Sequence, residues 1–440
     1  MTPGARIAAA IEIIDRLDET GVPADGAIER YFRKRRYAGA KDRRAVTERV
    51  FGIVRRRARL DWWMLRVQDN RKPDGRRRAL ADLALADGLT RSGIESLFDG
   101  AGYAPKQLTA EETELVDALA GETLDHPDQP AWVAHEFPSW LERPLSDLLN
   151  GYLPEEMDAL NTAALLDLRV NTLKGDCARA LEVLKSDRIE AEPTALSPIG
   201  LRVQGRVNLQ AATAYKGGFV EVQDEGSQII ALLAGAEAGM KVADFCAGAG
   251  GKTLAIAAAM KDQGEITACD IDPKRLGALK PRLKRAECRS VESRVLVPGG
   301  DMWIHDNEGA MDRVLADVPC SGTGRWRRRP DARWRLTGRE LRDLAKDQRR
   351  ILHEACRLVK PGGRLIYATC SILAEENERQ IEDFLEWFGG FRVVPVKRVW
   401  EETIGGACPA DPARDGDFLR LTPHRHGTDG FFVAVLERTA

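Results

Sequence analysis

The chain has 440 residues, 43% of them hydrophobic, and its 66 basic side chains nearly balance 68 acidic ones for a net charge of −2. This length predicts two to three domains, and the hydrophobic content argues against general disorder. No apolar run approaches the ~20 residues of a membrane span. The eight cysteines include no Cys-x-x-Cys pair, which favours reduced thiols and a cytoplasmic protein. We also expect the protein to be a monomer.

Residues 1–145 are predicted to form an all-helical domain followed by an acidic connector. The expected helices include Ala5–Leu17, Asp42–Met64 and Glu111–Ala120. Residues 31–78 carry 18 basic against 5 acidic side chains, whereas residues 106–160 carry 2 against 13. Arginine clusters with tryptophans nearby are typical of RNA-binding surfaces, although such runs also line ordinary solvated helices. The tryptophans concerned are Trp62, Trp63, Trp326 and Trp334, the last two in a second basic stretch at 325–350.

Residues 146–235 are predicted to form a small α+β module, because the hydrophobic period changes there from helical to alternating. The expected strands are Leu168–Asn171, Leu201–Val203 and Phe219–Val222, with helices at Cys177–Ser186 and Gln223–Leu233.

Residues 236–440 repeat a strand, turn and helix pattern. The expected strands are Lys241–Phe245, Glu265–Asp270, Arg294–Val297, Arg313–Asp317, Arg364–Thr369 and Phe431–Leu436. The expected helices are Thr253–Met260, Lys274–Ala286, Thr337–Leu358 and Glu375–Phe388. This alternation predicts an α/β fold with a doubly wound parallel sheet of Rossmann-like type.

A glycine-rich turn joins the first of these strands to its helix. It reads Cys246-Ala247-Gly248-Ala249-Gly250-Gly251-Lys252-Thr253. A P-loop requires glycine where Cys246 stands, and a dinucleotide fingerprint requires a third glycine where Thr253 stands. An NTPase and an NAD site are therefore disfavoured, yet the turn still brings backbone amides close to a ligand.

Acidic residues follow the next strands. Asp270 ends the second strand, where a carboxylate can accept both ribose hydroxyls of an adenosine-containing ligand, and Asp301 follows the third, where it can receive an adenine amino group. Turn formation and helix capping are the alternative explanation for both. No set of residues has the spacing of a metal site, since His424 and His426 lack a third ligand.

Two cysteines stand just past later strands, in Asp317-Val318-Pro319-Cys320-Ser321 and Thr369-Cys370-Ser371. Ligands bind beyond the carboxyl ends of parallel strands, so both thiols are expected beside the glycine turn. A thiolate that adds to C6 of cytosine makes C5 nucleophilic enough to take a methyl group, and a second group must help the adduct break down. Asp317 is placed to hydrogen-bond the base. Buried cysteines are often only small apolar residues, and the chemistry alone accepts either thiol as nucleophile.

At these residues the chain resembles the Sun/Nop2/Fmu family of RNA 5-methylcytosine methyltransferases, and most closely its bacterial ribosomal RNA branch. The resemblance covers residues 165–440. Besides the motifs above it includes Leu168-Arg169-Val170-Asn171-Thr172-Leu173-Lys174, Val222-Gln223-Asp224-Glu225-Gly226-Ser227-Gln228, Ser321-Gly322-Thr323-Gly324 and Asp429-Gly430-Phe431-Phe432. The first 120 residues resemble the NusB-type helical RNA-binding domain of the same branch, mainly over Lys41–Leu60.

The resemblance implies a class I methyltransferase that uses S-adenosylmethionine and acts on RNA. It implies that Cys370 is the nucleophile and that Cys320 assists elimination and product release. The implied pocket for the donor and the cytosine consists of Cys246, Ala247, Gly248, Ala249, Gly250, Gly251, Lys252, Asp270, Arg275, Asp301 and Asp317. Gly248-Ala249 replaces the Ala-Pro usual in this family, and Arg329 stands where a histidine usually precedes Pro-Asp.

We therefore expect methylation of cytosine C5 in ribosomal RNA. The alternatives are a tRNA substrate, or an RNA-binding or ribosome assembly factor that keeps the fold without catalysis. Intact Cys320, Cys370 and Asp317 argue against the second alternative. A DNA cytosine methyltransferase would use Cys320 as its nucleophile, which would reverse the roles of the two thiols.

Overall fold

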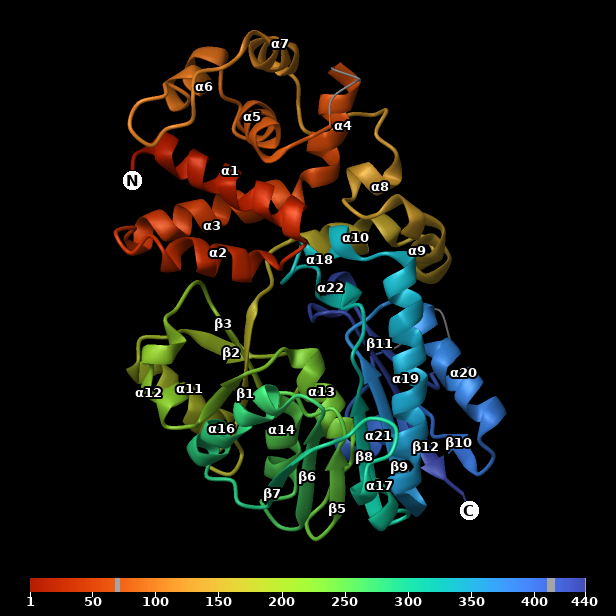
Figure 1. The fold of residues 1–440 in the computed structure, drawn as a ribbon. Helices are drawn as coiled ribbons and strands as arrows, with labels where there is room; N and C mark the ends of the chain where they lie inside the picture. The colour runs from red at the N-terminus through yellow and green to blue at the C-terminus, as the bar shows by residue number, and fades with distance from the viewer. Residues whose placement is uncertain (68–71, 410–415, 440) are drawn as a thin grey trace. The chain divides into compact units, whose positions relative to one another are not determined.

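The computed structural model describes residues 1–67, 72–409 and 416–439 (Figure 1). They form two compact units, one of Met1–Thr162 with Trp326–Leu336 and the other of Ala163–Arg325 with Thr337–Ala440. The predicted domain boundaries at residues 145 and 235 stay predictions. Within the described part of the chain, no helix is long and apolar enough to cross a membrane.

The first unit is helical in its described residues. Its helices are α1 (Pro3–Thr20), α2 (Ala24–Arg33), α3 (Ala40–Arg55), α4 (Arg57–Val67), α5 (Gly75–Leu85), α6 (Arg91–Leu97), α7 (Ala110–Leu119), α8 (Ala131–Ala134), η1 (Ser139–Leu141), α9 (Glu142–Leu149), α10 (Leu153–Asn161) and α18 (Ala332–Arg335). Nearly every residue of α5 is buried, and α1, α3, α4 and α7 pack around it. This helix therefore forms the centre of the unit.

Ion pairs inside the helical unit neutralise much of the basic stretch at 31–78. Arg59 contacts Glu136 at 2.9 Å and Asp125 at 2.7 Å, while Arg66 contacts Asp128 at 2.9 Å. Similar pairs join Arg76 to Glu112, Arg78 to Asp18 and Asp61, and Asp82 to Arg49 and Arg56. The uneven charge of the sequence thus reflects, in good part, basic helices that pair with the acidic connector.

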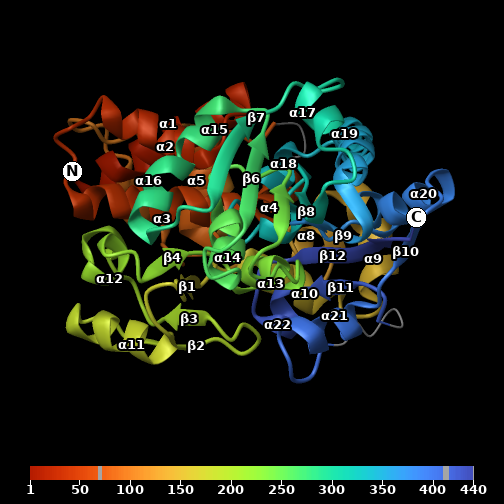
Figure 2. The same cartoon turned by 90° about the horizontal axis from the view of Figure 1, so that it is seen from below.

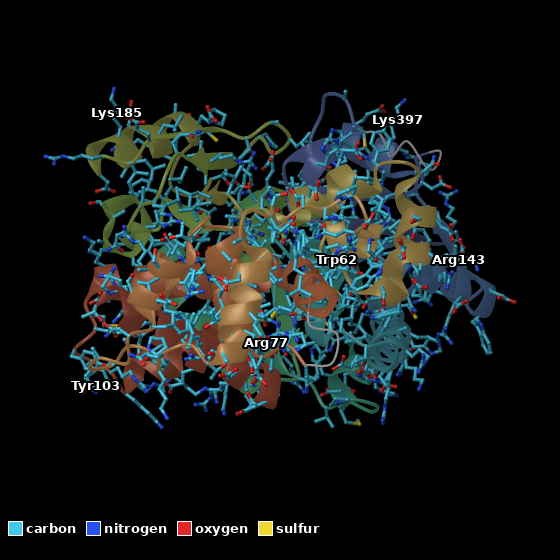
Figure 3. The ribbon with its side chains drawn as sticks, turned by 90° about the horizontal axis from the view of Figure 1, so that it is seen from above. Trp62, Arg77, Tyr103, Arg143, Lys185 and Lys397 are labelled. Carbon is cyan, nitrogen blue, oxygen red and sulfur yellow. The ribbon has the colours of Figure 1, made fainter. Side chains whose placement is uncertain are left out.

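Several of the aromatic and basic residues expected at an RNA surface are internal instead. Trp326 and Arg333 are buried, and the Arg333 guanidinium donates to the backbone carbonyls of Glu136 and Leu160. Trp62, labelled in Figure 3, lies edge-on to Trp63 with ring centroids 5.2 Å apart. The expectation of an open basic and aromatic surface is therefore wrong for Trp63, Trp326 and Arg333, which are buried in the helical unit, whereas Trp62 and Trp334 are half-buried.

The second unit begins with a small antiparallel sheet in the order β2-β3-β1-β4. Its elements are β1 (Leu166–Val170), α11 (Cys177–Ser186), β2 (Ala191–Pro193), β3 (Gly200–Val203), η2 (Leu209–Ala211), α12 (Thr213–Lys216) and β4 (Val220–Val222). Leu168, Leu201 and Val220 are fully buried from the strands, and Ala180 and Leu184 face them from α11. The predicted strands and the helix at Cys177–Ser186 are present, with β2 as an additional edge strand, whereas the bounds of the module at 146–235 stay a prediction.

The large sheet has the order β10-β12-β9-β8-β5-β6-β7, with β11 paired to β12 (Figure 2). Its strands are β5 (Lys241–Asp244), β6 (Glu265–Asp270), β7 (Val291–Val295), β8 (Met311–Asp317), β9 (Val359–Thr369), β10 (Phe391–Val393), β11 (Leu419–Leu421) and β12 (Phe431–Arg438). Strands β5 to β9 pair in parallel, which confirms the doubly wound fold, whereas β12 runs antiparallel to its neighbours. The sheet is therefore mixed at one side.

Alternate side chains along the strands pack on opposite faces of this sheet, so the sheet has one hydrophobic core on each face. Val242, Leu315 and Ile366 pack beneath α13 (Glu225–Leu233), α14 (Gly251–Ala259), α16 (Leu279–Ala286) and α21 (Val396–Thr403). Ala243, Val314 and Leu365 pack beneath α17 (Met302–Asp306), α19 (Gly338–Leu358) and α20 (Glu378–Trp387). The remaining short elements are α15 (Pro273–Gly277), η3 (Thr323–Arg325), η4 (Ala374–Glu376) and α22 (Pro423–His426).

Strand β5 lies between β6 and β8, so the order of the sheet reverses beside it. In open parallel sheets the ligand crevice lies outside the carboxyl ends of the strands at such a reversal. The glycine turn follows β5, and both candidate cysteines follow β8 and β9. The topology therefore brings all of these segments to one edge of the sheet.

Candidate active site

The turn after β5 is held in a conformation that only glycine adopts easily at two positions. Gly248 and Gly250 have φ values of 56° and 79°. A Cβ added to Gly250 would lie 2.1 Å from Leu279 Cδ1 in α16, so the turn also packs too closely for a side chain there. Helix α14 starts directly after this turn. Its first backbone N–H groups, which have no partner within the helix, therefore line the place where a ligand would approach.

Asp270, at the end of β6, braces this turn from the neighbouring strand. Its Oδ2 accepts from the Gly248 N–H at 2.8 Å and its Oδ1 accepts from the Asp272 N–H at 2.9 Å. Arg275 lies 3.6 Å from the same carboxylate, with a largely exposed side chain. Each carboxylate oxygen keeps a further lone pair for a ligand, so Asp270 fits a group with two adjacent hydroxyls.

Asp301 lies beyond the end of β7 and caps helix α17. Its Oδ1 accepts from the Trp303 N–H at 2.9 Å, and its Oδ2 accepts from the Val297 N–H at 2.8 Å. This is the capping arrangement that the sequence left open as an alternative. Within the described residues no hydrogen bond or ion pair joins Asp301 to the turn, so its part in a ligand pocket stays a prediction.

Lys252 and Asp317 connect the turn after β5 to the end of β8. The Lys252 Nζ lies 2.6 Å from the Asp317 Oδ2. The lysine side chain is 11% exposed and the aspartate 28% exposed. This half-buried pair places a carboxylate with free lone pairs beside the two cysteine segments.

Cys320 and Cys370 lie side by side. Strands β8 and β9 run parallel with Asp317 opposite Ala368, so the segments that follow them leave the sheet together. The two Sγ atoms are 3.4 Å apart, and both side chains are partly exposed. The Gly324 N–H donates to the Cys370 carbonyl at 3.0 Å and ties the two loops together. Two thiols fifty residues apart in the sequence thus lie in contact at the end of the sheet.

The surroundings move the pKa values of these thiols in opposite directions. The hydrogen bond from Cys320, followed by the cations Arg325 and Lys252, lowers the pKa of Cys370. The hydrogen bond to Cys370, burial and the Glu376 carboxylate raise the pKa of Cys320 well above the usual value. These directions favour Cys370 as the more acidic thiol of the pair and Cys320 as the one that keeps its proton.

Cys246 lies in the turn but has different surroundings. Burial, followed by the carboxylates of Asp317, Asp244 and Asp270, raises the pKa of its thiol well above the usual value. A thiol of this kind is a poor nucleophile at neutral pH. Cys246 packs against the core beneath the sheet, and its assignment to the donor pocket stays a prediction.

A buried polar network supports the two cysteine loops, and the sequence prediction did not include it. The Thr323 and Ser371 hydroxyls are 3.0 Å apart, and the Thr323 Oγ1 also accepts from the Ile372 N–H at 2.9 Å. Glu376 in η4 accepts from Ser321 and from Gln348 of α19. The Ser or Thr that accompanies each cysteine was the available signal, whereas Glu376 and Gln348 become neighbours only in the folded chain.

Comparison with known proteins gives the chain a family. Residues 231–437 match the model described as 16S rRNA methyltransferase RsmB/F, and residues 137–210 match the ferredoxin-like domain of RsmF/B-like methyltransferases. The solved structure of PH0851 superposes with a TM-score of 0.77 at 28% identity, covering 100% of this chain and 99% of the other. That of NSun6 from Pyrococcus horikoshii, with the ligand SFG, has a TM-score of 0.61 at 20% identity over 69% of this chain and 99% of its own.

Two curated relatives match along nearly their whole length. The probable ribosomal RNA small subunit methyltransferase B of Synechocystis is 31% identical over 94% of this chain and 95% of its own. The ribosomal RNA small subunit methyltransferase B of Yersinia pseudotuberculosis is 30% identical, with 90% of each chain covered. With the sheet order, the glycine turn and the paired thiols, these matches show that the chain belongs to the RsmB/F family of rRNA methyltransferases.

Proposed function

We propose that this protein transfers a methyl group from S-adenosylmethionine to C5 of a cytosine in 16S ribosomal RNA. The observation that carries the proposal is the pair of thiols 3.4 Å apart whose pKa values are moved in opposite directions. A pyrimidine C5 methyltransferase needs one thiolate to attack the ring and a second group to help release it. The small-subunit rRNA is inferred from the names of the family and of the relatives above.

The residues of the glycine turn fit the donor. Bound S-adenosylmethionine would supply an electrophilic methyl group on its sulfonium sulfur. Gly248, Gly250 and Gly251 let the backbone approach the ligand closely, the first N–H groups of α14 have no partner within the helix, and Asp270 offers its free lone pairs to the ribose hydroxyls. Cys246, Ala247, Ala249 and Lys252 complete this turn, and Arg275 and Asp301 are the remaining residues that we assign to the donor pocket.

Cys370 starts the reaction in this proposal. Its thiolate forms a bond to C6 of the cytosine, and the electron pair displaced to C5 forms the new carbon–carbon bond to the methyl group. The methyl–sulfur bond would break in the same step, and S-adenosylhomocysteine would leave with that electron pair on its sulfur. Asp317 accepts a hydrogen bond from the cytosine edge and so offsets charge on the ring, while Lys252 holds the Asp317 carboxylate in place at 2.6 Å.

Cys320 then completes the reaction. Once Cys370 is bound to carbon it carries no charge and no longer accepts a hydrogen bond from Cys320. Both effects had kept Cys320 protonated, so this thiol ionises more readily after the adduct forms. The resulting thiolate takes the proton from C5, the electron pair re-forms the C5–C6 double bond, and the bond from C6 to the Cys370 sulfur breaks.

The helical unit retains a basic surface that fits an RNA backbone. We call the basic turn the exposed stretch from the end of α2 into the first turn of α3 that contains Lys34, Arg36, Lys41 and Arg44. Within the described part of the chain these four side chains have no ion-pair partner, unlike the arginines buried around α5. Tyr37 lies among them and is 66% exposed, so it offers a ring on which a base can stack.

The experiment uses RNA labelled with tritium at cytosine C5. Methylation at C5 releases this tritium into water, whereas methylation of a ring nitrogen or a ribose oxygen does not. The protein is incubated with S-adenosylmethionine and either a 16S rRNA transcript or a tRNA pool, and bisulfite sequencing then locates the product. RNA labelled at C6 serves as the matched control.

We expect tritium release from 16S rRNA that matches methyl incorporation one for one. Tritium release from the tRNA pool but not from 16S rRNA would contradict ribosomal RNA as the substrate and show that tRNA is the substrate instead. Methyl incorporation without tritium release would overturn the proposed position on the base. RNA binding with neither result would favour a non-catalytic assembly factor.

A further inference from the structure

Glu376 is a buried carboxylate that touches the loop carrying Cys320. Its Oε1 accepts from the Ser321 N–H at 2.8 Å and its Oε2 accepts from the Ser321 hydroxyl at 2.5 Å. The Gln348 Nε2 of α19 donates to the same Oε1 at 2.9 Å and to the Pro319 carbonyl at 3.0 Å. Glu376 and Gln348 therefore clamp the residues on both sides of Cys320.

The carboxylate has no basic partner. Glu376 is 0% exposed, and no Lys, Arg or His nitrogen in the described residues lies within ion-pairing distance of it. Burial of a charge is costly unless it is paired, so such a residue is an unusual choice for the core. Three hydrogen bonds, two from Ser321 and one from Gln348, satisfy its carboxylate oxygens. An amide at this position would lack the charge yet fill nearly the same space.

The charged and titratable groups around the two thiols come from five elements. Glu376 of η4 and Tyr367 of β9 lie on the side of Cys320, and the Tyr367 hydroxyl donates to the Glu376 carbonyl at 2.5 Å. Lys252, Arg325 and Asp317 lie on the side of Cys370. The negative charge of Glu376 therefore acts on Cys320, while the cations act on Cys370.

We propose that Glu376 is a positioning residue for methyl transfer: its carboxylate fixes the Cys320 thiol against Cys370 and keeps the proton on Cys320 until the adduct has formed. A thiol held protonated by a neighbouring carboxylate is also a stronger base once it ionises, and this suits the later removal of the C5 proton. The inference rests on the proposed function for that last step, whereas the effect on the two free thiols does not depend on RNA.

The first test measures the thiols alone. The full-length protein, without RNA or methyl donor, is alkylated with iodoacetamide over a range of pH values, and mass spectrometry of peptides follows Cys320 and Cys370 separately. In Glu376→Gln the Cys320 profile should move to lower pH. Glu375→Gln is the matched control, because its neighbouring carboxylate pairs with Arg379 at 3.3 Å on the surface and not with the loop.

The second test measures turnover and the covalent adduct. Glu376→Ala removes the clamp as well as the charge, so turnover should fall on the order of 10²-fold through misplacement of Cys320. An RNA adduct that survives denaturation should accumulate, because Cys370 still attacks while Cys320 no longer assists release. An unfolded variant would form no adduct, so this result separates lost positioning from lost folding.

The proposal is overturned if the Cys320 profile of Glu376→Gln matches that of the wild type and Glu375→Gln. It is also overturned if Glu376→Ala turns over normally, or if it loses turnover without any adduct while circular dichroism shows a folded protein. If the wild type fails to methylate cytosine C5, the proposed function fails, but the alkylation profiles still decide whether Glu376 holds the proton on Cys320.

Discussion

Replacement of Asp270 by asparagine tests the donor pocket. Asp270 uses one oxygen for the Gly248 N–H and the other for the Asp272 N–H. Asparagine has only one acceptor oxygen, so one of these backbone groups would face an amide NH₂. The same loss applies to the ligand, because the amide can accept from only one of the two ribose hydroxyls.

The magnitude follows from the number of bonds lost. A hydrogen bond to a charged group contributes about 1.5 to 3 kcal/mol, so loss of a single ligand bond weakens binding by about 10- to 150-fold. Disturbance of Gly248, which shapes the turn, adds to this loss. We therefore expect Asp270→Asn to bind S-adenosylmethionine at least about tenfold more weakly than the wild type.

The assay is isothermal titration of the purified protein with S-adenosylmethionine and with S-adenosylhomocysteine. Asp272→Asn is the matched control. Only the Oδ1 of Asp272 accepts hydrogen bonds, from the N–H groups of Lys274 and Arg275, and asparagine caps a helix as well as aspartate does. Unchanged affinity in Asp270→Asn, or an equal loss in Asp272→Asn, would refute the placement of the ribose at Asp270.

Three further predictions concern charge. Lys252→Met removes a cation that lowers the pKa of Cys370, so the pH at which turnover rises should move upward, and a pH–rate profile with an unmoved acidic limb would contradict this. Burial raises the pKa of Asp244 from 3.8 to about 7. Between pH 4 and pH 7 the folded state holds a proton on Asp244 that the unfolded state has lost, so the free energy of unfolding of the wild type should fall by up to about 4 kcal/mol as the pH rises through this range. Asp244→Asn should lack this fall when unfolding is measured by urea titration at each pH. Alanine at three residues of the basic turn should weaken RNA binding and flatten its steep salt dependence in filter-binding assays; an unchanged slope would remove this turn from the RNA surface.

The sequence predicted the catalytic edge of the sheet better than its periphery. Buried strands such as Glu265–Asp270 are followed by a glycine or end in an acidic residue, so both their hydrophobic pattern and their ends can be recognised in the sequence. Strand β7 starts at Val291, three residues before the predicted start at Arg294. The prediction missed this start because the strand is largely exposed and has no alternation of apolar residues. The short strands β10 and β11 were missed because three residues are too few to show a period, and their pairing with β12 defines them.

Two predicted helices are each divided in the structure. The predicted helix Asp42–Met64 breaks at Arg56, where the Glu136 carboxylate caps the start of α4 by accepting from the Ala58 and Arg59 N–H groups. A cap from about eighty residues away leaves no local signal. The predicted helix Lys274–Ala286 breaks at Ala278, and here the signal was visible, because Pro281 fits the first turn of a new helix but not the interior of a long one.

The two thiols illustrate what the sequence left undecided. Their motifs and strand ends predicted that they would lie together, and the distance of 3.4 Å confirms it. Their separate roles came from the family resemblance alone, since the chemistry accepted either as nucleophile. The asymmetry of their surroundings arises from Arg325 and Lys252 on one side and Glu376 on the other, which only the folded chain brings near.

The most direct test of the proposed mechanism compares alanine at each of the two cysteines. Both variants are incubated with 16S rRNA and S-adenosylmethionine, and denaturing gels are used to detect protein bound covalently to RNA. We expect Cys370→Ala to give neither product nor adduct, and Cys320→Ala to accumulate an adduct that survives denaturation. An adduct formed by Cys370→Ala would contradict the assignment of Cys370 as the nucleophile.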